Sequence, residues 1–266
     1  VVDLRSLGME GLRPFTGWTD PVFMGYRGPE VESVRALSCP SCAAPIELRA
    51  PGVTARVACS YCGSELGTSE QGGGIALAVI EASSRPPFSP TLPLGSFGTL
   101  RGQRWQVIGA MVRSVREDGI DWTWTEFLLH NPYHGFAWLV EDSGGHWSYV
   151  RKLSVAPPST RRLATLDGRR YRSYSRGQAR VRSVLGEFYW EVCSGDQAVT
   201  QDYVAPPLML SMERAEREVS WSLGVWMEPE EIRAAFRLDG ILGSTGIAPH
   251  QPNPYQRPAV RRLATF

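Results

Sequence analysis

The hydrophobic and polar positions of this chain follow a strand pattern over most of its length. Between Leu94 and Met227, short runs rich in Val, Trp, Tyr and Phe alternate with turns that contain Gly, Asp or Asn. Such runs, bounded by turn residues, are typical of β-strands. The strands that this pattern predicts are 103–115, 121–129, 136–141, 146–153, 169–175, 178–186, 188–193, 208–213 and 217–227.

The last periodic segment, residues 228–238, differs from the others because its spacing is helical. Pro229 stands at a first helical position, and glutamates follow it in the first turn. Ile232 and Phe236 are spaced so that they share one face of a helix. The sequence therefore predicts one short helix docked on the sheet.

The strand-rich region contains a weak internal repeat. Three pairs of matching segments recur in the same order: "LRGQRW" at 100–105 with "LDGRRY" at 166–171, "VRSV" at 112–115 with 181–184, and Glu141 before "HWSY" with Glu213 before "SWSL". The offset stays near seventy residues. We therefore expect a mainly β fold with two related meander halves, about 94–157 and 163–238, arranged as a sandwich or a barrel.

Changes in composition divide the chain into five parts. A proline-rich stretch, "RPPFSPTLP" at 85–93, marks the main boundary. The expected parts are an irregular segment at 1–32, a small cysteine module at 33–68, a linker at 69–93, the β-rich domain at 94–238 and a Pro/Gly-rich tail at 239–266.

Composition places the chain among globular proteins. Hydrophobic residues make up 42% of the 266 residues and charged residues 21%. The formal net charge is +1, so no overall electrostatic attraction to nucleic acid or to a membrane follows. The sequence has no run of about eighteen apolar residues, and it therefore predicts no transmembrane helix.

Four of the five cysteines lie in one short segment. Cys39 and Cys42 form one C-x-x-C pair, and Cys59 and Cys62 form a second one after sixteen intervening residues. Two residues between cysteines make a tight turn that brings both thiolates within about 2.3 Å of one metal ion. Gly63 follows the second pair, where a positive φ is often needed. The spacing predicts a zinc ribbon in which "PIELR" and "VTARVA" form a hairpin between the pairs.

Zinc is the metal that this spacing favours, and three alternatives stay open. An iron site of the rubredoxin type also needs four cysteines, and two redox dithiols or two disulfides fit the count as well. Because cysteine would fill every position, no coordination position remains for water, and we expect a structural zinc. Cys193 stands alone and is expected to be a small buried apolar residue.

Residues 94–238 resemble the bacterial family called domain of unknown function 4178. The family pattern is a glycine and an aromatic residue before Val-Ile-Gly, then Trp-x-Glu-aromatic-x-Leu, then a Trp-Leu pair. The matching positions are Gly102, Trp105, 107–109, Trp124, Glu126, Phe127, Leu129, Trp138 and Leu139. A ribbon ahead of this domain is a common pairing in such proteins, and we expect the motif residues to be structural.

The resemblance implies little about activity, because the family has no established one to carry over. Its members resemble components of bacterial gene clusters that also encode enzymes similar to those of polyamine synthesis, membrane proteins and phage-shock-type coat proteins. Some members end in membrane segments, and the proline-rich tail at 239–266 is of the sort that leads to one.

Residues 161–182 form a run of arginines with a single acid, Asp167. The eight arginines are Arg161, Arg162, Arg169, Arg170, Arg172, Arg176, Arg180 and Arg182. This run is typical either of a contact with phosphates, an anionic membrane surface or an acidic protein, or of two strands with solvated arginine faces. Because surface charge runs are usually solvated, we favour the second interpretation.

The sequence contains no set of side chains that predicts a catalytic centre. It has no nucleophile elbow, phosphate-binding loop, dinucleotide fingerprint or H-E-x-x-H motif. Glu126 is the carboxylate of most interest because it would share a strand face with Trp122 and Trp124, where burial raises a carboxylate pKa. We expect it to cap a turn or to pair with an arginine. His130 and His134 are expected to be loop histidines.

The sequence therefore favours a non-enzymatic zinc-ribbon adaptor or scaffold for protein–protein contacts in a bacterial, membrane-associated assembly. A reducing cytoplasm, at the inner face of the membrane for such an assembly, suits the cysteines best. Two alternatives stay open: an enzyme or small-molecule-binding domain associated with polyamine metabolism, and a nucleic-acid-binding ribbon protein. Other proteins are the expected partners, nucleic acid is less expected, and the oligomeric state is not predicted.

Overall fold

The computed structural model describes residues 37–71, 74–83, 88–216, 218–240 and 242–252, which form fifteen strands and one helix. The cysteine module contains β1 Leu37–Ser38, β2 Pro45–Ile46, β3 Arg56–Ala58, β4 Glu65–Gln71 and β5 Gly74–Glu81. The rest are β6 Phe97–Leu100, β7 Gln103–Glu117, β8 Ile120–Asn131, β9 Gly135–Asp142, β10 Trp147–Lys152, β11 Leu163–Leu166, β12 Arg169–Phe188, β13 Gln197–Ala205, β14 Leu208–Arg214, β15 Val219–Met227 and α1 Pro229–Phe236.

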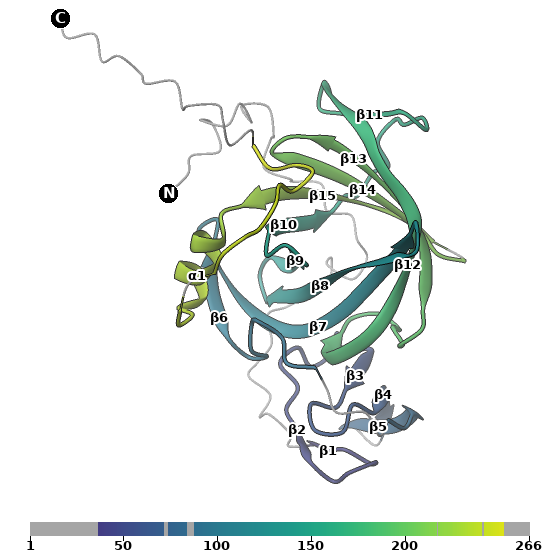
Figure 1. The fold of residues 1–266 in the computed structure, drawn as a ribbon. Coiled ribbons are helices and arrows are strands. Elements are labelled where there is room, and N and C mark those ends of the chain that lie inside the picture. The colour runs from purple at the N-terminus through teal and green to yellow at the C-terminus, as the bar shows by residue number, and fades with distance from the viewer. Residues whose placement is uncertain (1–36, 72–73, 84–87, 217, 241, 253–266) are drawn as a thin grey trace, which may run out of the picture.

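Eight strands of the second group close into an antiparallel barrel (Figure 1). Their order is β7-β8-β9-β10-β15-β14-β13-β12, and β12 pairs again with β7. The barrel thus consists of two four-stranded meanders, β7 to β10 and β12 to β15, which join through the pairs β10–β15 and β12–β7. The predicted mainly β fold with two meander halves is confirmed, and the barrel is the correct one of the two expected arrangements.

The internal repeat has a structural counterpart. β6 precedes the first meander and β11 the second, and each pairs with the long strand that follows it. The turns after them, Arg101–Gly102 and Asp167–Gly168, both have two consecutive positive φ values, 52° and 75° in the first and 50° and 75° in the second. Such values are typical of a tight hairpin turn. The two "VRSV" segments lie on the paired parts of β7 and β12 where the barrel closes.

Side chains along each barrel strand point alternately to the inside and to the outer face. Arg113 on β7 contacts Glu213 on β14, although β12 and β13 separate these strands in the sheet. Side chains can meet over that separation only on the concave side, so both point to the inside of the barrel. Residues that lie opposite each other in neighbouring strands point to the same side. The pairing registers therefore extend the inward or outward assignment from Arg113 and Glu213 to the neighbouring strands.

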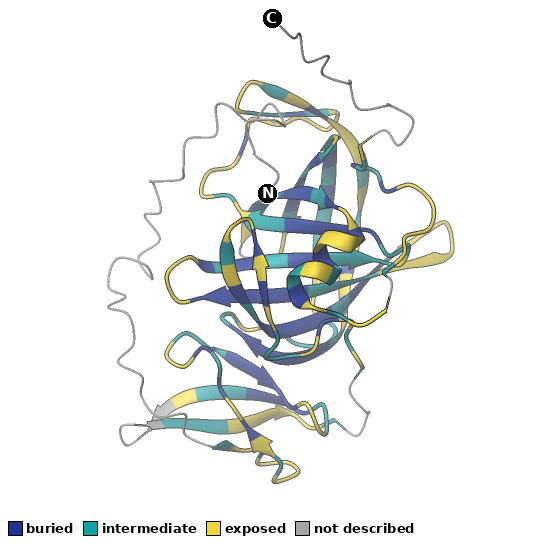
Figure 2. Cartoon of the chain, turned by 90° about the vertical axis from the view of Figure 1, so that its left-hand side faces the viewer, coloured by how far each residue is buried: buried dark blue, intermediate teal, exposed yellow. Residues whose placement is uncertain are grey.

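The outer face of the first meander carries the largest apolar core. Trp105, Phe127 and Trp147 are fully buried in it, and Ile232 and Phe236 of α1 pack over them. Figure 2 shows α1 lying across the outside of these strands. The helix begins at Pro229, so the predicted helix and its first position are confirmed. A second cluster, which includes Tyr203 and Leu210, lies on the outer face of the second meander against β11.

The strand predictions in the β-rich domain were wrong in three respects. β6, β11 and β13 were not predicted, residues 169–175 and 178–186 belong to the single strand β12, and residues 189–193 form no strand. β13 escaped prediction because its inward side chains are polar. Thr200 and Asp202 are inward-facing and partly exposed, and they remove the apolar signal from every second position.

The linker expected at 69–93 is wrong for its first half. β4 and β5 are antiparallel partners with Gln71 opposite Gly74, so the chain forms a hairpin there. Ile75 and Leu77 pack against the core of the cysteine module. The apolar run that follows the glycines is therefore the last strand of the module.

The hairpin expected between the two cysteine pairs is also wrong. β2 pairs with β1, while β3 pairs with β4 and with β12. Each cysteine pair thus lies in the turn of its own two-stranded unit. The short spacing between β1 and β2, and between β3 and β4, favours these local pairings over one across the longer loop.

Part of the expected tail belongs to the folded body. Thr245 N donates to Gly144 O over 2.7 Å, and the ring of buried His250 lies 2.7 Å from Ser148 Oγ. Residues 242–252 therefore pack on the barrel. The segments 1–36 and 253–266, which include the expected irregular N-terminus and the end of the tail, lie outside the described residues.

Two inward-facing glycines give a matched test of the barrel closure. A Cβ at Gly109 would lie 2.3 Å from the backbone oxygen of Glu187, whereas a Cβ at Gly224 would meet nothing nearer than 3.4 Å. Gly109→Ala is therefore expected to lower the free energy of unfolding by about 3 kcal/mol through overpacking, and Gly224→Ala to change it by less than about 1 kcal/mol. Urea denaturation of both variants checks this, and equal effects would contradict close contact of β7 with β12.

Candidate metal centre

Each C-x-x-C pair lies in a turn with the same backbone geometry. Ala43 N donates to Cys39 O over 2.8 Å, and Gly63 N donates to Cys59 O over 2.9 Å. Both donors have positive φ, 61° at Ala43 and 74° at Gly63. The predicted positive φ at Gly63 is confirmed, and the first turn holds the same conformation without a glycine.

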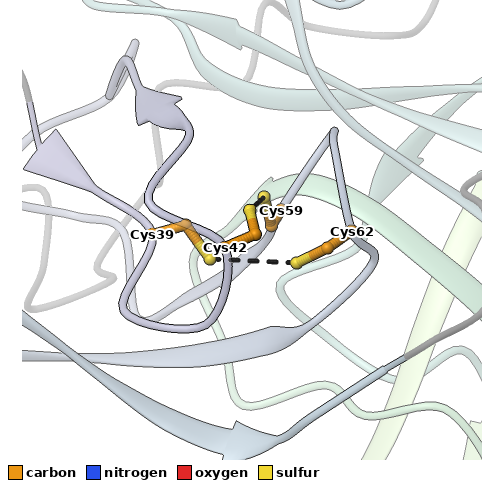
Figure 3. Close-up of side chains that lie close together, drawn as sticks. All are labelled: Cys39, Cys42, Cys59 and Cys62. Atoms are coloured by element: carbon orange, nitrogen blue, oxygen red, sulfur yellow. Dashed lines mark hydrogen bonds between the residues drawn. The ribbon is translucent and has the colours of Figure 1, made fainter.

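The four sulfur atoms converge on one point (Figure 3). Cys39 Sγ lies 3.9 Å from Cys62 Sγ, Cys42 Sγ lies 3.8 Å from Cys59 Sγ, and all four atoms lie within 4.8 Å of one another. These distances are too long for disulfides. A tetrahedron with metal–sulfur bonds of about 2.3 Å has edges of about 3.8 Å. The cysteines therefore fit one tetrahedral metal ion.

The thiols of this cluster do not ionise equally by themselves. Burial raises the pKa of Cys59 to about 12. The pKa of Cys62 is lowered to about 6, because hydrogen bonds with Ser64 and the neighbouring cysteines outweigh the raising effect of burial. A metal ligand must be a thiolate, so binding of a divalent cation would drive off the remaining protons. A bound cation would therefore stabilise all four cysteines as thiolates.

The cysteine module is fixed to the barrel by backbone pairing and by one buried carboxylate. β3 lies beside β12, with Val57 opposite Glu187. The Glu187 carboxylate accepts hydrogen bonds from Arg49 N at 2.7 Å, Ala50 N at 3.0 Å and Thr54 Oγ1 at 2.9 Å. Burial raises the pKa of Glu187, and these donors act against that rise. Strands β3, β4 and β5 of the module therefore continue the barrel sheet from β12.

The outer edge of this extension is strand β5. In the described part of the chain, β5 pairs only with β4, so its other edge is open. Val79 is 41% exposed and Ile80 is 55% exposed. The strand carries one charged residue, Glu81, and neither lysine nor proline, which commonly protect an open edge.

Glu126 pairs with an arginine inside the barrel, as expected. Arg113 Nη1 lies 3.0 Å from Glu126 Oε1 and 2.6 Å from Glu213 Oε1, and Trp124 Nε1 donates to Glu126 Oε1 over 2.7 Å. Burial raises the pKa of Glu126, while Arg113 and the indole donor lower it. Burial lowers the pKa of Arg113, but the two carboxylates outweigh it and raise that pKa. We call these four residues the interior charge cluster.

The other motif residues have structural surroundings. Gly102 lies in the β6–β7 turn, Trp105 and Phe127 are buried in the outer core, and Trp138 faces the inside of the barrel. His130 is buried near the end of β8, so the expected loop position is wrong for it. Cys193 is half-buried and free.

The predicted arginine run lies before β11 and along β12. Exposed side chains belong to Arg161, Arg162, Arg170, Arg172, Arg176, Arg180 and Arg182, and Arg169 is half-buried. On β12 they alternate with buried residues such as Tyr171 and Val181. Within the described ranges none of the eight takes part in an ion pair. This is the pattern of solvated strand faces, and a contact with an anionic partner stays a prediction.

The cysteine cluster is the one candidate metal site among the described residues. No other group of three or more His, Cys, Asp or Glu side chains there is close enough to hold one ion. Within the same ranges, no helix has both the length and the apolar content needed to cross a membrane.

Comparison with known proteins gives one match. The family model described as "Domain of unknown function (DUF4178)" matches residues 93–229. The match covers every barrel strand together with β6 and β11, and it excludes the cysteine module. A search of curated proteins and a search of solved structures found no match.

Proposed function

The chain belongs to the DUF4178 family, and we propose that it is a non-enzymatic zinc-ribbon adaptor that binds other proteins in a bacterial assembly. The single observation that carries this proposal is the open edge of β5. This edge belongs to a sheet that a metal ion and the barrel both hold in place. Free cysteines suit a reducing cytoplasm, which we propose as its location.

Zinc is the proposed metal because the ligands are four cysteines in a tetrahedral arrangement. Cys39, Cys42, Cys59 and Cys62 would hold it, and it would contribute a cross-link between the two turns. With four protein ligands the ion keeps no open position for a substrate. Its role is then to fix the orientation of β3 to β5 relative to the barrel.

The open edge suits a partner that adds a strand. Main-chain hydrogen bonds from an extended segment would extend the β4–β5 pair, and the exposed side chains of Ala78, Val79 and Ile80 would contact alternate residues of that segment. A rigid edge lowers the entropic cost of such pairing because only the partner must become ordered. The barrel would then position the partner relative to its own surfaces.

A double substitution on this edge tests the adaptor role. Ala78→Lys with Ile80→Lys places charges on one face of β5 and is expected to abolish recovery of specific partners in cross-linking pull-downs from the source bacterium. The matched control is Val155→Lys, since Val155 is 74% exposed and belongs to the loop between β10 and β11, not to the module. Partners that are recovered equally with all three proteins would contradict binding at the β5 edge.

A further inference from the structure

Solvent reaches part of the inside of the barrel, while inward-facing apolar residues such as Met111, Leu128 and Val181 fill another part. Along residues 135–140 of β9 and 208–213 of β14, buried residues alternate with partly exposed ones. The buried positions, such as Leu139 and Leu210, point outward into the apolar clusters. The partly exposed positions, such as Val140 and Ser211, are the inward-facing ones. An eight-stranded barrel whose interior is not filled by side chains can hold one small ligand.

The charged groups around Arg113 do not balance, although Lys152, which pairs with Glu218, and exposed Arg172 also stand at inward-facing positions. Glu126, Glu213 and Asp202 contribute three carboxylates, and Arg113 is the guanidinium that pairs with two of them. Asp202 Oδ2 accepts a hydrogen bond from Ser175 Oγ over 2.6 Å, and burial raises the pKa of Asp202. The surroundings of Arg113 therefore favour an additional positive charge.

Two carboxylate oxygens are placed to receive that charge. Arg113 Nη1 contacts only the Oε1 atoms of Glu126 and Glu213, and the Oε2 atoms have no hydrogen-bond partner among the described residues. The Glu213 side chain is 36% exposed and the Glu126 side chain 13%. Arg113 itself is 6% exposed, and its Nε has no partner in the described part of the chain. The free Oε2 atoms of Glu126 and Glu213 could therefore accept hydrogen bonds from a bound molecule.

A bare metal ion does not suit this arrangement. The three carboxylates are not among the groups of described side chains that lie close enough to ligate one ion. The half-exposed ring of Trp124, whose face already receives the Arg113 guanidinium at 5.6 Å, adds an aromatic wall beside the carboxylates. Carboxylates several ångströms apart next to an indole match an organic ammonium group, which is larger than a metal ion and is attracted to aromatic faces.

We propose that the inside of the barrel binds a small organic cation, with its ammonium group between the free oxygens of Glu126 and Glu213 and its apolar part against inward-facing Val140 and Val150. The site is independent of the β5 edge, so failure of either proposal leaves the other standing.

Calorimetric titration of the full chain with n-butylammonium chloride, at constant ionic strength, tests the proposal. Saturable binding is expected, together with a rise in the melting temperature. Sodium butyrate and n-butanol, which share the alkyl chain but lack the positive charge, are expected to bind at least about tenfold more weakly. Equal binding of the three compounds, or no saturable binding of the ammonium, would overturn the proposal.

Two variants locate the binding inside the barrel. Glu213→Gln is expected to weaken n-butylammonium binding at least about tenfold. Glu218→Gln, on an exposed residue that pairs with Lys152, is expected to leave it unchanged. Ser222→Leu adds bulk to an inward-facing position without changing a charge, and it is expected to weaken binding as well. If Glu213→Gln does not fold, Ser222→Leu decides, and wild-type affinity in either folded variant would refute the site.

Discussion

Replacing Cys59 with serine is expected to remove the bound metal and to unfold the cysteine module while the barrel stays folded. Structural zinc contributes about 10–16 kcal/mol of apparent binding free energy in small zinc modules, and that energy is folding energy. The apolar core of the module is small and includes Cys39 and Cys59 themselves. Without the ion, the burial of Ile46, Leu48 and Leu66 is too little to hold the two turns together.

Two measurements check this result. Elemental analysis is expected to find one zinc ion per wild-type chain and none in Cys59→Ser. Hydrogen exchange is expected to show loss of protection in residues 37–83 of the variant, with protection retained in β7 to β10. The barrel should melt at a lower temperature, because Glu187 loses the donors of the module and stays buried.

The remaining cysteine supplies the control. Cys193→Ser changes a free, half-buried thiol outside the cluster and is expected to keep the metal and the protection pattern of the wild type. A Cys59→Ser variant that still binds stoichiometric metal, or a wild-type chain with a Cys39–Cys62 disulfide, would contradict the metal centre. Iron in place of zinc would contradict the proposed metal but not the site.

The sequence predicted the metal ligands because their signal is local. Two C-x-x-C pairs need only their own turns to bring the thiolates together, and the structure has the same backbone hydrogen bond in both turns. The short helix was equally predictable, since Pro229 and the spacing of Ile232 and Phe236 act within a few residues. Such features depend little on the rest of the chain.

The pairing of strands could not be predicted in the same way. β3 pairs with β12, whose contact residue Glu187 is 130 positions from Val57, and no pattern in either strand specifies that partner. β13 was also missed, because the buried side chains of this barrel lie on its outer face. The inward-facing residues Thr200 and Asp202 make the sequence of β13 look polar. Glu126 was recognised as unusual, yet its partners Arg113 and Glu213 lie on strands that only the closed barrel brings together.

The weak repeat carried more information than any single strand. It predicted that residues after about 163 would repeat the meander before them, and the structure places β6 to β10 and β11 to β15 in equivalent positions. The halves differ in what covers them, because α1 packs on the first meander only. The second meander is instead covered by β11, and its first strand, β12, carries most of the arginine run. The two halves have thus kept one topology and taken on different surfaces.

Replacing Arg113 with leucine is expected to be the most destabilising single change inside the barrel. The substitution leaves Glu126 and Glu213 buried or half-buried without their cation, and loss of one partner from a buried ion pair costs about 3–5 kcal/mol. The matched control is Arg116→Leu on the same strand. Arg116 is 70% exposed and faces Asp121 at 3.6 Å, so its loss should cost less than about 1 kcal/mol.

The pH dependence of this loss distinguishes a charge effect from a packing effect. Burial already raises the pKa of Glu126, and removal of Arg113 takes away the largest opposing influence, so that pKa should rise further. A carboxyl whose folded pKa exceeds its unfolded value binds more protons in the folded state, and stability then increases as the pH falls through the folded pKa. The difference in free energy of unfolding between Arg113→Leu and the wild type should therefore shrink between pH 7 and pH 5. Adding Glu126→Gln and Glu213→Gln to Arg113→Leu should recover most of the loss at pH 7, whereas a loss that is the same at both pH values and is not rescued would show that Arg113 acts by filling space.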